Sequence, residues 1–232
     1  NGFSQQTKYL YQVPADLKRR FCDSLAEAYR RRLIYVDEPP AYRDEQRLLP
    51  EDILKFLKHI RHFGAELTAD GTMYKRVQLQ ILDRLNVKEE PVGKGGWRFG
   101  YGRKINEYPN RFSLIYDYCY YNRLIDELDG ELALTEAGAS MAAENRVPDT
   151  GDVYRFWLRL YQNPIRNLQS IVHWIDRLAG EWVTLDSLSR VLLSLIRPYY
   201  YDSPESIFNN RIIVMMMHLG LLRIGESPGA GA

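Results

Sequence analysis

Residues 50–85, PEDILKFLKHIRHFGAELTADGTMYKRVQLQILDRL, hold the pattern that decides the fold. Pro50 occupies a first helical position, acidic residues follow it, and Gly64 marks the end of the helix. After a short extended segment over residues 66–68 and a turn at residues 70–71, apolar residues again recur at helical spacing. The stretch therefore predicts two helices connected by a short strand.

The same half of the chain continues with a loop, a third helix and a hairpin. Glycines are frequent over residues 91–104, and a helix is expected after Pro109. Two short apolar strands then flank a turn at residues 129–130, which is typical of a β-hairpin. The order of helix, short strand, helix, helix and hairpin is that of a winged helix. Residues 46–150 are therefore predicted to form a first winged-helix module.

A similar order recurs in the second half of the chain, which predicts a second winged-helix module over residues 151–232. Its predicted elements are, in order, a helix over 168–178, a short strand over 182–184, helices over 185–196 and 204–218, and a wing strand over 221–224. The chain provides no return strand after this wing strand. We therefore expect the second module to be truncated in its wing.

Residues 1–45 are predicted to form an N-terminal helical arm and linker. Apolar residues after Pro14 recur at helical spacing, and the prolines and mixed charges of residues 39–47 indicate a linker. The predicted fold class is therefore mostly α, with tandem winged-helix (helix-turn-helix with small β-wings) modules.

Composition is that of an ordinary globular protein of two domains. The 232 residues exceed the usual single-domain length, and hydrophobic residues make up 45% of them. Because 31 Lys and Arg residues nearly balance 30 Asp and Glu residues, the net charge is +1. A DNA-binding protein of this charge has to gather its cations on one face.

Cellular location is predicted from the cysteines and from the hydropathy pattern. Cys22 and Cys119 lie inside apolar helical patterns, which is typical of reduced core thiols. No apolar run approaches the roughly 20 residues that cross a bilayer, and no signal peptide is evident. We expect a cytoplasmic protein without a membrane partner.

Three phrases of the sequence resemble a known family. They are LTADGTMYKR at residues 67–76, LTEAG at residues 134–138 and FWL at residues 156–158. They resemble the helicase-associated winged-helix region found beside XPB-type DNA repair helicases, where an L-T-x-x-G phrase precedes a helix and another closes the wing. The resemblance implies association with DNA processing. It does not imply helicase activity, because the ATPase core of those helicases is absent from this chain.

The glycine-rich loop GKGGWRFGYGRK at residues 93–104 interleaves five glycines, four cations and three aromatic residues. Such a loop can place cations along phosphates and rings against bases. The predicted nucleic-acid contacts of the loop are Lys94, Trp97, Arg98, Tyr101, Arg103 and Lys104. Alternatively, the loop is simply exposed, or is an ordered hairpin with its aromatic rings buried. It lacks the G-x-x-x-x-G-K-[ST] pattern of a P-loop.

The third helix of each module supplies further candidates, because this helix usually enters the major groove. The candidates are Arg111 in the first module and Asn209, Asn210 and Arg211 in the second. The first of these helices also carries Asp117 and several tyrosines, so its surface is poorly suited to binding phosphate. Neither helix is basic enough to predict sequence-specific reading of DNA.

Catalytic and metal-binding signatures are absent from the sequence. It contains no H-E-x-x-H motif, no Ser-His-Asp signature and no zinc-type cysteine spacing. His59 and His62 are three residues apart near a predicted helix end, where positive charge is favourable, so we interpret them as structural. We expect no cofactor, no metal site and no enzymatic activity.

The function predicted from these patterns is that of a non-catalytic, DNA-associated binding module, accessory to DNA repair or helicase machinery. Its expected partner is DNA or a protein of a DNA-processing complex. The alternative is a protein–protein interaction scaffold that uses the same folds without DNA contact, which the near-neutral charge favours.

Overall fold

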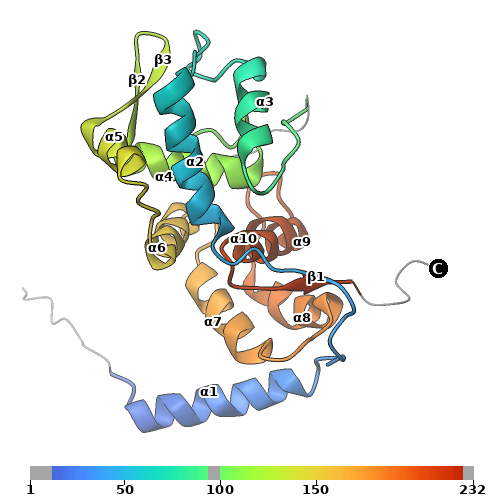
Figure 1. The fold of residues 1–232 in the computed structure, drawn as a ribbon. Helices are drawn as coiled ribbons and strands as arrows, with labels where there is room; N and C mark the ends of the chain where they lie inside the picture. The colour runs from blue at the N-terminus through green and yellow to red at the C-terminus, as the bar shows by residue number, and fades with distance from the viewer. Residues whose placement is uncertain (1–11, 94–99, 227–232) are drawn as a thin grey trace, which may run out of the picture.

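A computed structural model describes residues 12–93 and 100–226 of the chain (Figure 1). The described part is mostly helical and contains two small sheets of two strands each. The prediction of a mostly α protein is therefore confirmed. Within these residues, no helix combines the length and apolar character needed to cross a bilayer.

The first half follows the predicted order of elements. These are α2 (Leu48–Phe63), α3 (Lys75–Arg84), α4 (Asn110–Tyr121), β2 (Ile125–Leu128), β3 (Glu131–Leu134) and α5 (Glu136–Ala143). Gly64 ends α2 with a φ of 66°, in the left-handed region that favours glycine. The extended segment after it lies beside the hairpin, because Leu67 N–H donates to Gly130 O and Leu132 N–H donates to Ala65 O.

The second half is a stack of short helices. It comprises α6 (Thr150–Tyr161), α7 (Leu168–Leu178), α8 (Leu185–Leu192), a 3-10 turn (Leu193–Leu195), α9 (Pro204–Ser206), the π-helical segment η2 (Ile207–Ile213), α10 (Val214–His218) and β4 (Ile224–Gly225). Side chains cap three of these helices: Asp149 caps α6, Thr184 caps α8 and Ser203 caps α9. The predicted strand over residues 182–184 is only a single bridge, between Val183 and Tyr35.

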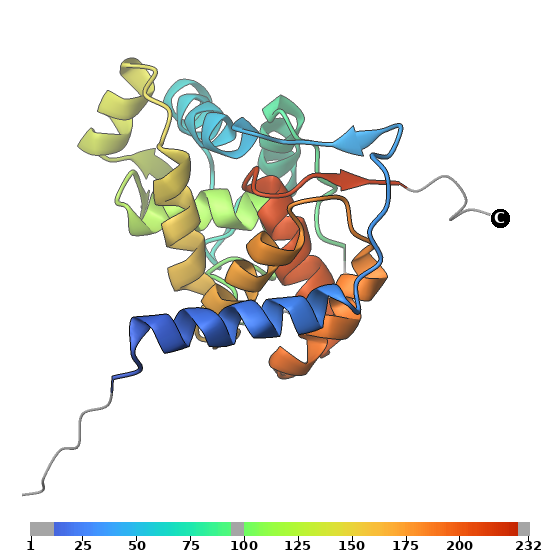
Figure 2. The same cartoon turned by 90° about the horizontal axis from the view of Figure 1, so that it is seen from below.

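The N-terminal arm packs on the second half of the chain. Its helix α1 (Ala15–Arg30) lies along α7, and the Tyr29 ring meets Trp174 edge-on at 5.1 Å. Strand β1 (Tyr42–Arg43) then pairs antiparallel with β4, Tyr42 opposite Gly225. Figure 2 shows the blue β1 arrow beside the red β4 arrow.

The strand that completes the second β pair therefore comes from the arm. The predicted truncation of the second wing stays a prediction, because residues 227–232 lie outside the described residues. Strand β4 nevertheless has a partner, which the sequence did not predict. The partner lies in the stretch that we interpreted as a linker, and residues 12–45 accompany the second half in space.

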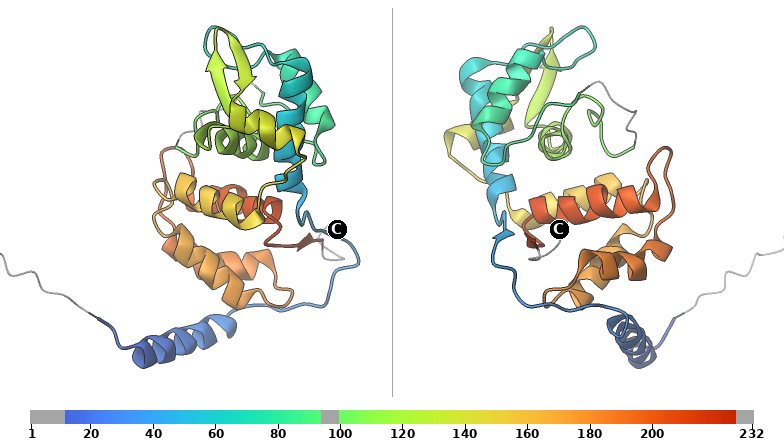
Figure 3. Two further views of the ribbon diagram at one scale, coloured as in Figure 1. Left: turned by 60° about the vertical axis from the view of Figure 1, so that its left-hand side comes forward. Right: turned by 90° about the vertical axis from the view of Figure 1, so that its right-hand side faces the viewer.

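One hydrophobic core joins the two halves. Its buried residues include Phe56 of α2, Phe112 of α4, Trp157 of α6 and Ile212 of η2. Both views of Figure 3 show the resulting layers, with α1 at one end, then α7 and α8, then α6 and α10, then the first half. Helix α4 lies at the junction and contacts α2, α6 and α10.

Candidate nucleic-acid interface

The third helices of the two halves face each other inside the molecule. Nine of the twelve residues of α4 are buried. In the second half, the run from Met215 to His218 is also buried, and α10 contacts α4. A helix covered to this extent cannot enter the major groove unless the core unpacks. Groove contact is therefore not available to the buried faces of α4 and α10, whereas Asn209 and Asn210, which precede α10, remain exposed.

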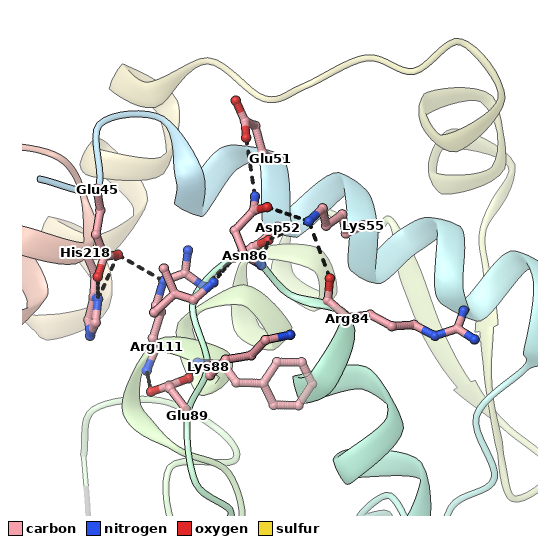
Figure 4. A network of polar contacts seen from close by, with 12 residues as sticks. Glu45, Glu51, Asp52, Lys55, Arg84, Asn86, Lys88, Glu89, Arg111 and His218 are labelled. Carbon is pink, nitrogen blue, oxygen red and sulfur yellow. Dashed lines mark hydrogen bonds and ion pairs between the residues drawn. The ribbon is translucent and has the colours of Figure 1, made fainter.

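Arg111, a predicted nucleic-acid contact, lies instead in a buried ionic network (Figure 4). Its side chain is 0% exposed, and its guanidinium lies 2.8 Å from Asp52 and 3.3 Å from Glu45. His218 Nδ1 lies 3.0 Å from both carboxylate oxygens of Glu45. The prediction of an exposed Arg111 was wrong, because its acidic partners lie far away in sequence, on α2 and on the arm.

The carboxylates of Glu89 and Glu45 are partly and fully buried, respectively, and hydrogen bonds and positive charges offset part of the cost of burying them. Glu89 accepts hydrogen bonds from the N–H groups of Arg111 and Phe112 at the start of α4. Burial raises the pKa of Glu89 in spite of these bonds. Burial would also raise the pKa of Glu45, but the hydrogen bond to His218 and the charges of His218 and Arg111 hold it below its ordinary value. The network joins the arm, α2, α4 and α10, so its role is to hold them together.

The described end of the glycine-rich loop, residues 100–104, is fastened to the first half. The Arg103 guanidinium donates to Glu127 Oε2 at 2.5 Å. Lys104 is buried, and its ammonium donates to the Asp70 carbonyl at 3.4 Å. Both predicted phosphate contacts therefore already have partners within the protein, and Lys104 has little access to solvent.

Asp117 of α4 anchors this loop from inside. Its Oδ2 accepts the Arg103 N–H at 3.0 Å, and a Cβ at Gly102 would lie only 2.0 Å from the same oxygen. Only glycine fits there, at a φ of 140°. Within the described residues, Oδ1 has no hydrogen-bond partner. Burial raises the pKa of Asp117 to about 7, although the bond from Arg103 lowers it. This carboxyl therefore titrates close to neutral pH.

Tyr101 and Arg211, also predicted to contact nucleic acid, pack against each other in the core. Tyr101 is 1% exposed, and its ring lies 5.2 Å from that of Tyr161. The Arg211 guanidinium covers the Tyr101 ring at 4.4 Å and donates to Asp202 and Asn110. For Tyr101, the alternative of a buried aromatic ring is therefore the observed one. Arg211 is buried because its guanidinium pairs with Asp202 and packs on the Tyr101 ring.

The remaining predicted contacts are Asn209, Asn210, Lys94, Trp97 and Arg98, of which the structure describes only the two asparagines. Asn209 and Asn210 are exposed on η2, so their contact with nucleic acid stays a prediction. Lys94, Trp97 and Arg98 lie outside the described residues.

A cleft that we did not predict lies between α6 and α7. Its volume is about 280 Å³, and we call it the arginine cleft; it is lined by Arg155, Leu158, Arg159, Gln162, Arg166, Leu168 and Gln169. Arg155 pairs with Asp152 at 2.6 Å. Arg159 and Arg166 are exposed and form no ion pair within residues 12–93 and 100–226. The sequence does carry a signal for this cleft, because residues 153–175 contain three arginines and no Asp or Glu.

Acidic residues gather elsewhere, on the hairpin of the first half. Residues 126–131 read DELDGE, and three of their four acids are exposed. In a winged helix that docks on DNA, this hairpin would face the phosphates. Its negative charge opposes that contact.

A second, larger pocket lies between the arm and the second half, with a volume of about 1070 Å³. Its lining mixes apolar residues such as Trp182 and Leu188 with acids such as Asp37 and Glu38 and with Arg47. This mixture indicates no particular ligand.

Metal-binding geometry is not found in the part of the chain that the structure describes, where no three His, Cys, Asp or Glu side chains gather into a possible metal site. His59 is buried, and His62 Nδ1 lies 2.7 Å from the Lys58 carbonyl.

Comparisons with known proteins identify no relative: no family profile matches the chain, and no curated protein and no solved structure is similar to it.

Proposed function

We propose that the chain is a non-catalytic, DNA-associated binding module made of two winged-helix units, accessory to DNA repair or helicase machinery. The repeated order of elements supports the two units, with β1 of the arm completing the second. The phrases at residues 67–76, 134–138 and 156–158, which resemble the helicase-associated region, support the link to DNA processing.

Separation of charge is the observation that carries the DNA-binding proposal. The chain has a net charge of only +1, yet residues 153–175 combine three arginines with no acid, while the acids of residues 126–131 lie on a hairpin of the other half. Figure 1 places that hairpin away from α6 and α7. A surface on which cations outnumber acids attracts the phosphate backbone even when the net charge is near zero.

DNA binding is tested by fluorescence anisotropy with labelled duplex and single-stranded oligonucleotides at low salt, followed by a salt titration. We expect binding whose logarithmic affinity falls linearly with the logarithm of salt concentration. Because α4 and α10 are mostly buried, we expect little preference among sequences. Absence of binding at low salt would overturn the proposal.

A protein-interaction scaffold is the second candidate function, and exposed apolar side chains on the arm favour it. Val13, Leu17 and Phe21 repeat every four residues and are 61%, 54% and 68% exposed. The two candidates are separated by the same anisotropy assay combined with the double variant Leu17→Ser/Phe21→Ser. A scaffold requires that DNA binding be absent and that the variant lose binding to a protein of a DNA-processing complex.

A further inference from the structure

The arginine cleft is lined by cationic and amide hydrogen-bond donors together with two leucines. Three guanidinium groups and the amides of Gln162 and Gln169 line it, and Leu158 and Leu168 supply its apolar atoms. Arginine presents a planar fork of donors that fits phosphate oxygens in a bidentate manner.

Two of the three arginines are available to a ligand. Arg155 shares its guanidinium with Asp152, and both side chains are more than half exposed. For Arg159 and Arg166, no acid or carbonyl partner is found in the described part of the chain. An exposed cation without a partner binds an anion at little cost in free energy, because no internal ion pair has to break.

The spacing of the arginines suits an extended anion better than a compact one. Arg155 and Arg159 are one helical turn apart, which places their backbones about 6 Å apart along α6. Arg166 enters from the turn between α6 and α7, on the far side of Gln162 in sequence. A row of this length can meet successive phosphates of one strand, whereas a single phosphate would engage only part of it.

We propose that the arginine cleft binds the phosphodiester backbone of nucleic acid, with Arg159 and Arg166 as the principal contacts. The inference rests on the proposed function and names the site that performs it. The buried faces of α4 and α10 cannot read base edges, so a contact through the cleft positions the protein on DNA without selecting a sequence.

The test compares two double variants with the same change in charge. Arg159→Gln/Arg166→Gln alters the cleft. Arg146→Gln/Arg190→Gln removes two exposed arginines that pair with Glu144 and Asp186 on other parts of the surface. Duplex affinity is measured by anisotropy over a salt series, and thermal unfolding of both variants verifies that the fold is retained.

We expect the cleft variant to bind duplex at least about tenfold more weakly than the control variant at low salt. Its salt dependence should flatten by up to roughly 0.9 units of slope for each lost phosphate contact. Equal affinity and slope in the two variants would overturn the inference and leave the proposed function standing. If the wild-type protein binds no nucleic acid, both are overturned. Binding of tripolyphosphate without nucleic-acid binding, measured by calorimetry, would identify a small-anion site and also overturn the inference.

Discussion

The guanidinium of Arg111 lies 2.8 Å from the carboxylate of Asp52, and neither side chain is exposed to solvent. A buried ion pair adds little stability relative to apolar residues of the same shape, but removing one partner leaves an uncompensated buried charge. Here the loss would leave two acids, Asp52 and Glu45, without their common cation.

Arg111→Met should therefore lower the free energy of unfolding by about 3–5 kcal/mol. The measurement is the midpoint of urea denaturation at constant pH. Arg61→Met, at an exposed position of α2, serves as the control and should change the free energy by less than about 0.5 kcal/mol. Equal midpoints for the two variants would show that the network does not hold the halves together.

Asp117→Asn should remove a pH dependence of stability. Because the pKa of Asp117 rises from 3.8 to about 7 on folding, the folded state binds its proton more tightly than the unfolded state. The resulting stability is fully present below pH 3.8 and is lost as the pH rises through about 7. The wild-type protein should thus lose up to about 4 kcal/mol over this range through this group.

The Asn variant keeps an acceptor for the Arg103 N–H but does not titrate. Its free energy of unfolding, measured by denaturant titrations between pH 4 and pH 8, should rise relative to that of the wild type as the pH increases. Parallel curves for the two proteins would mean that Asp117 is solvated and titrates normally.

Gly220→Ala should loosen the arm from the second half. Gly220 has a φ of 71°, and a Cβ there would lie 2.1 Å from the Gln46 carbonyl oxygen. Both the backbone strain and this contact oppose alanine, so we expect a loss of about 1–3 kcal/mol. We also expect faster proteolysis within residues 36–47, monitored by mass spectrometry.

Gly180→Ala is the matched control, because nothing lies within 4 Å of its added Cβ. It should leave stability unchanged or raise it slightly. If the two alanine variants are cleaved at the same rate, the close packing of Gly220 on Gln46 is not needed to keep the arm on the second half.

Local patterns predicted the elements of the first half well. Pro50, Gly64 and the turn at residues 129–130 are all local signals. Helix α2 begins at Leu48, slightly before Pro50, and ends at Gly64 as predicted, and the β2–β3 hairpin turns at residues 129–130. The pairing of Tyr42 with Gly225 could not be predicted in the same way. Two-residue strands carry no periodic signal, and their partners lie at opposite ends of the described chain.

Site residues were harder to predict than helices, for a related reason. A cation in a sequence is expected at the surface, but Arg111 is buried because acids from distant elements pair with it. Arg211 is buried beside Asp202, which is close in sequence, and against the distant ring of Tyr101. The sequence also contains a signal for exposed cations, which we did not use. The absence of acids from residues 153–175 could have identified Arg159 and Arg166 as exposed cations without partners.

The pairing of β1 with β4 also affects the order in which parts of the chain can fold during synthesis. Strand β1 leaves the ribosome long before β4, so the arm must wait for almost the whole chain before its strand partner exists. The first half has its own short-range contacts and can collapse meanwhile. The ring of Tyr29 on α1 likewise stays uncovered until α7 and its Trp174 have been synthesised.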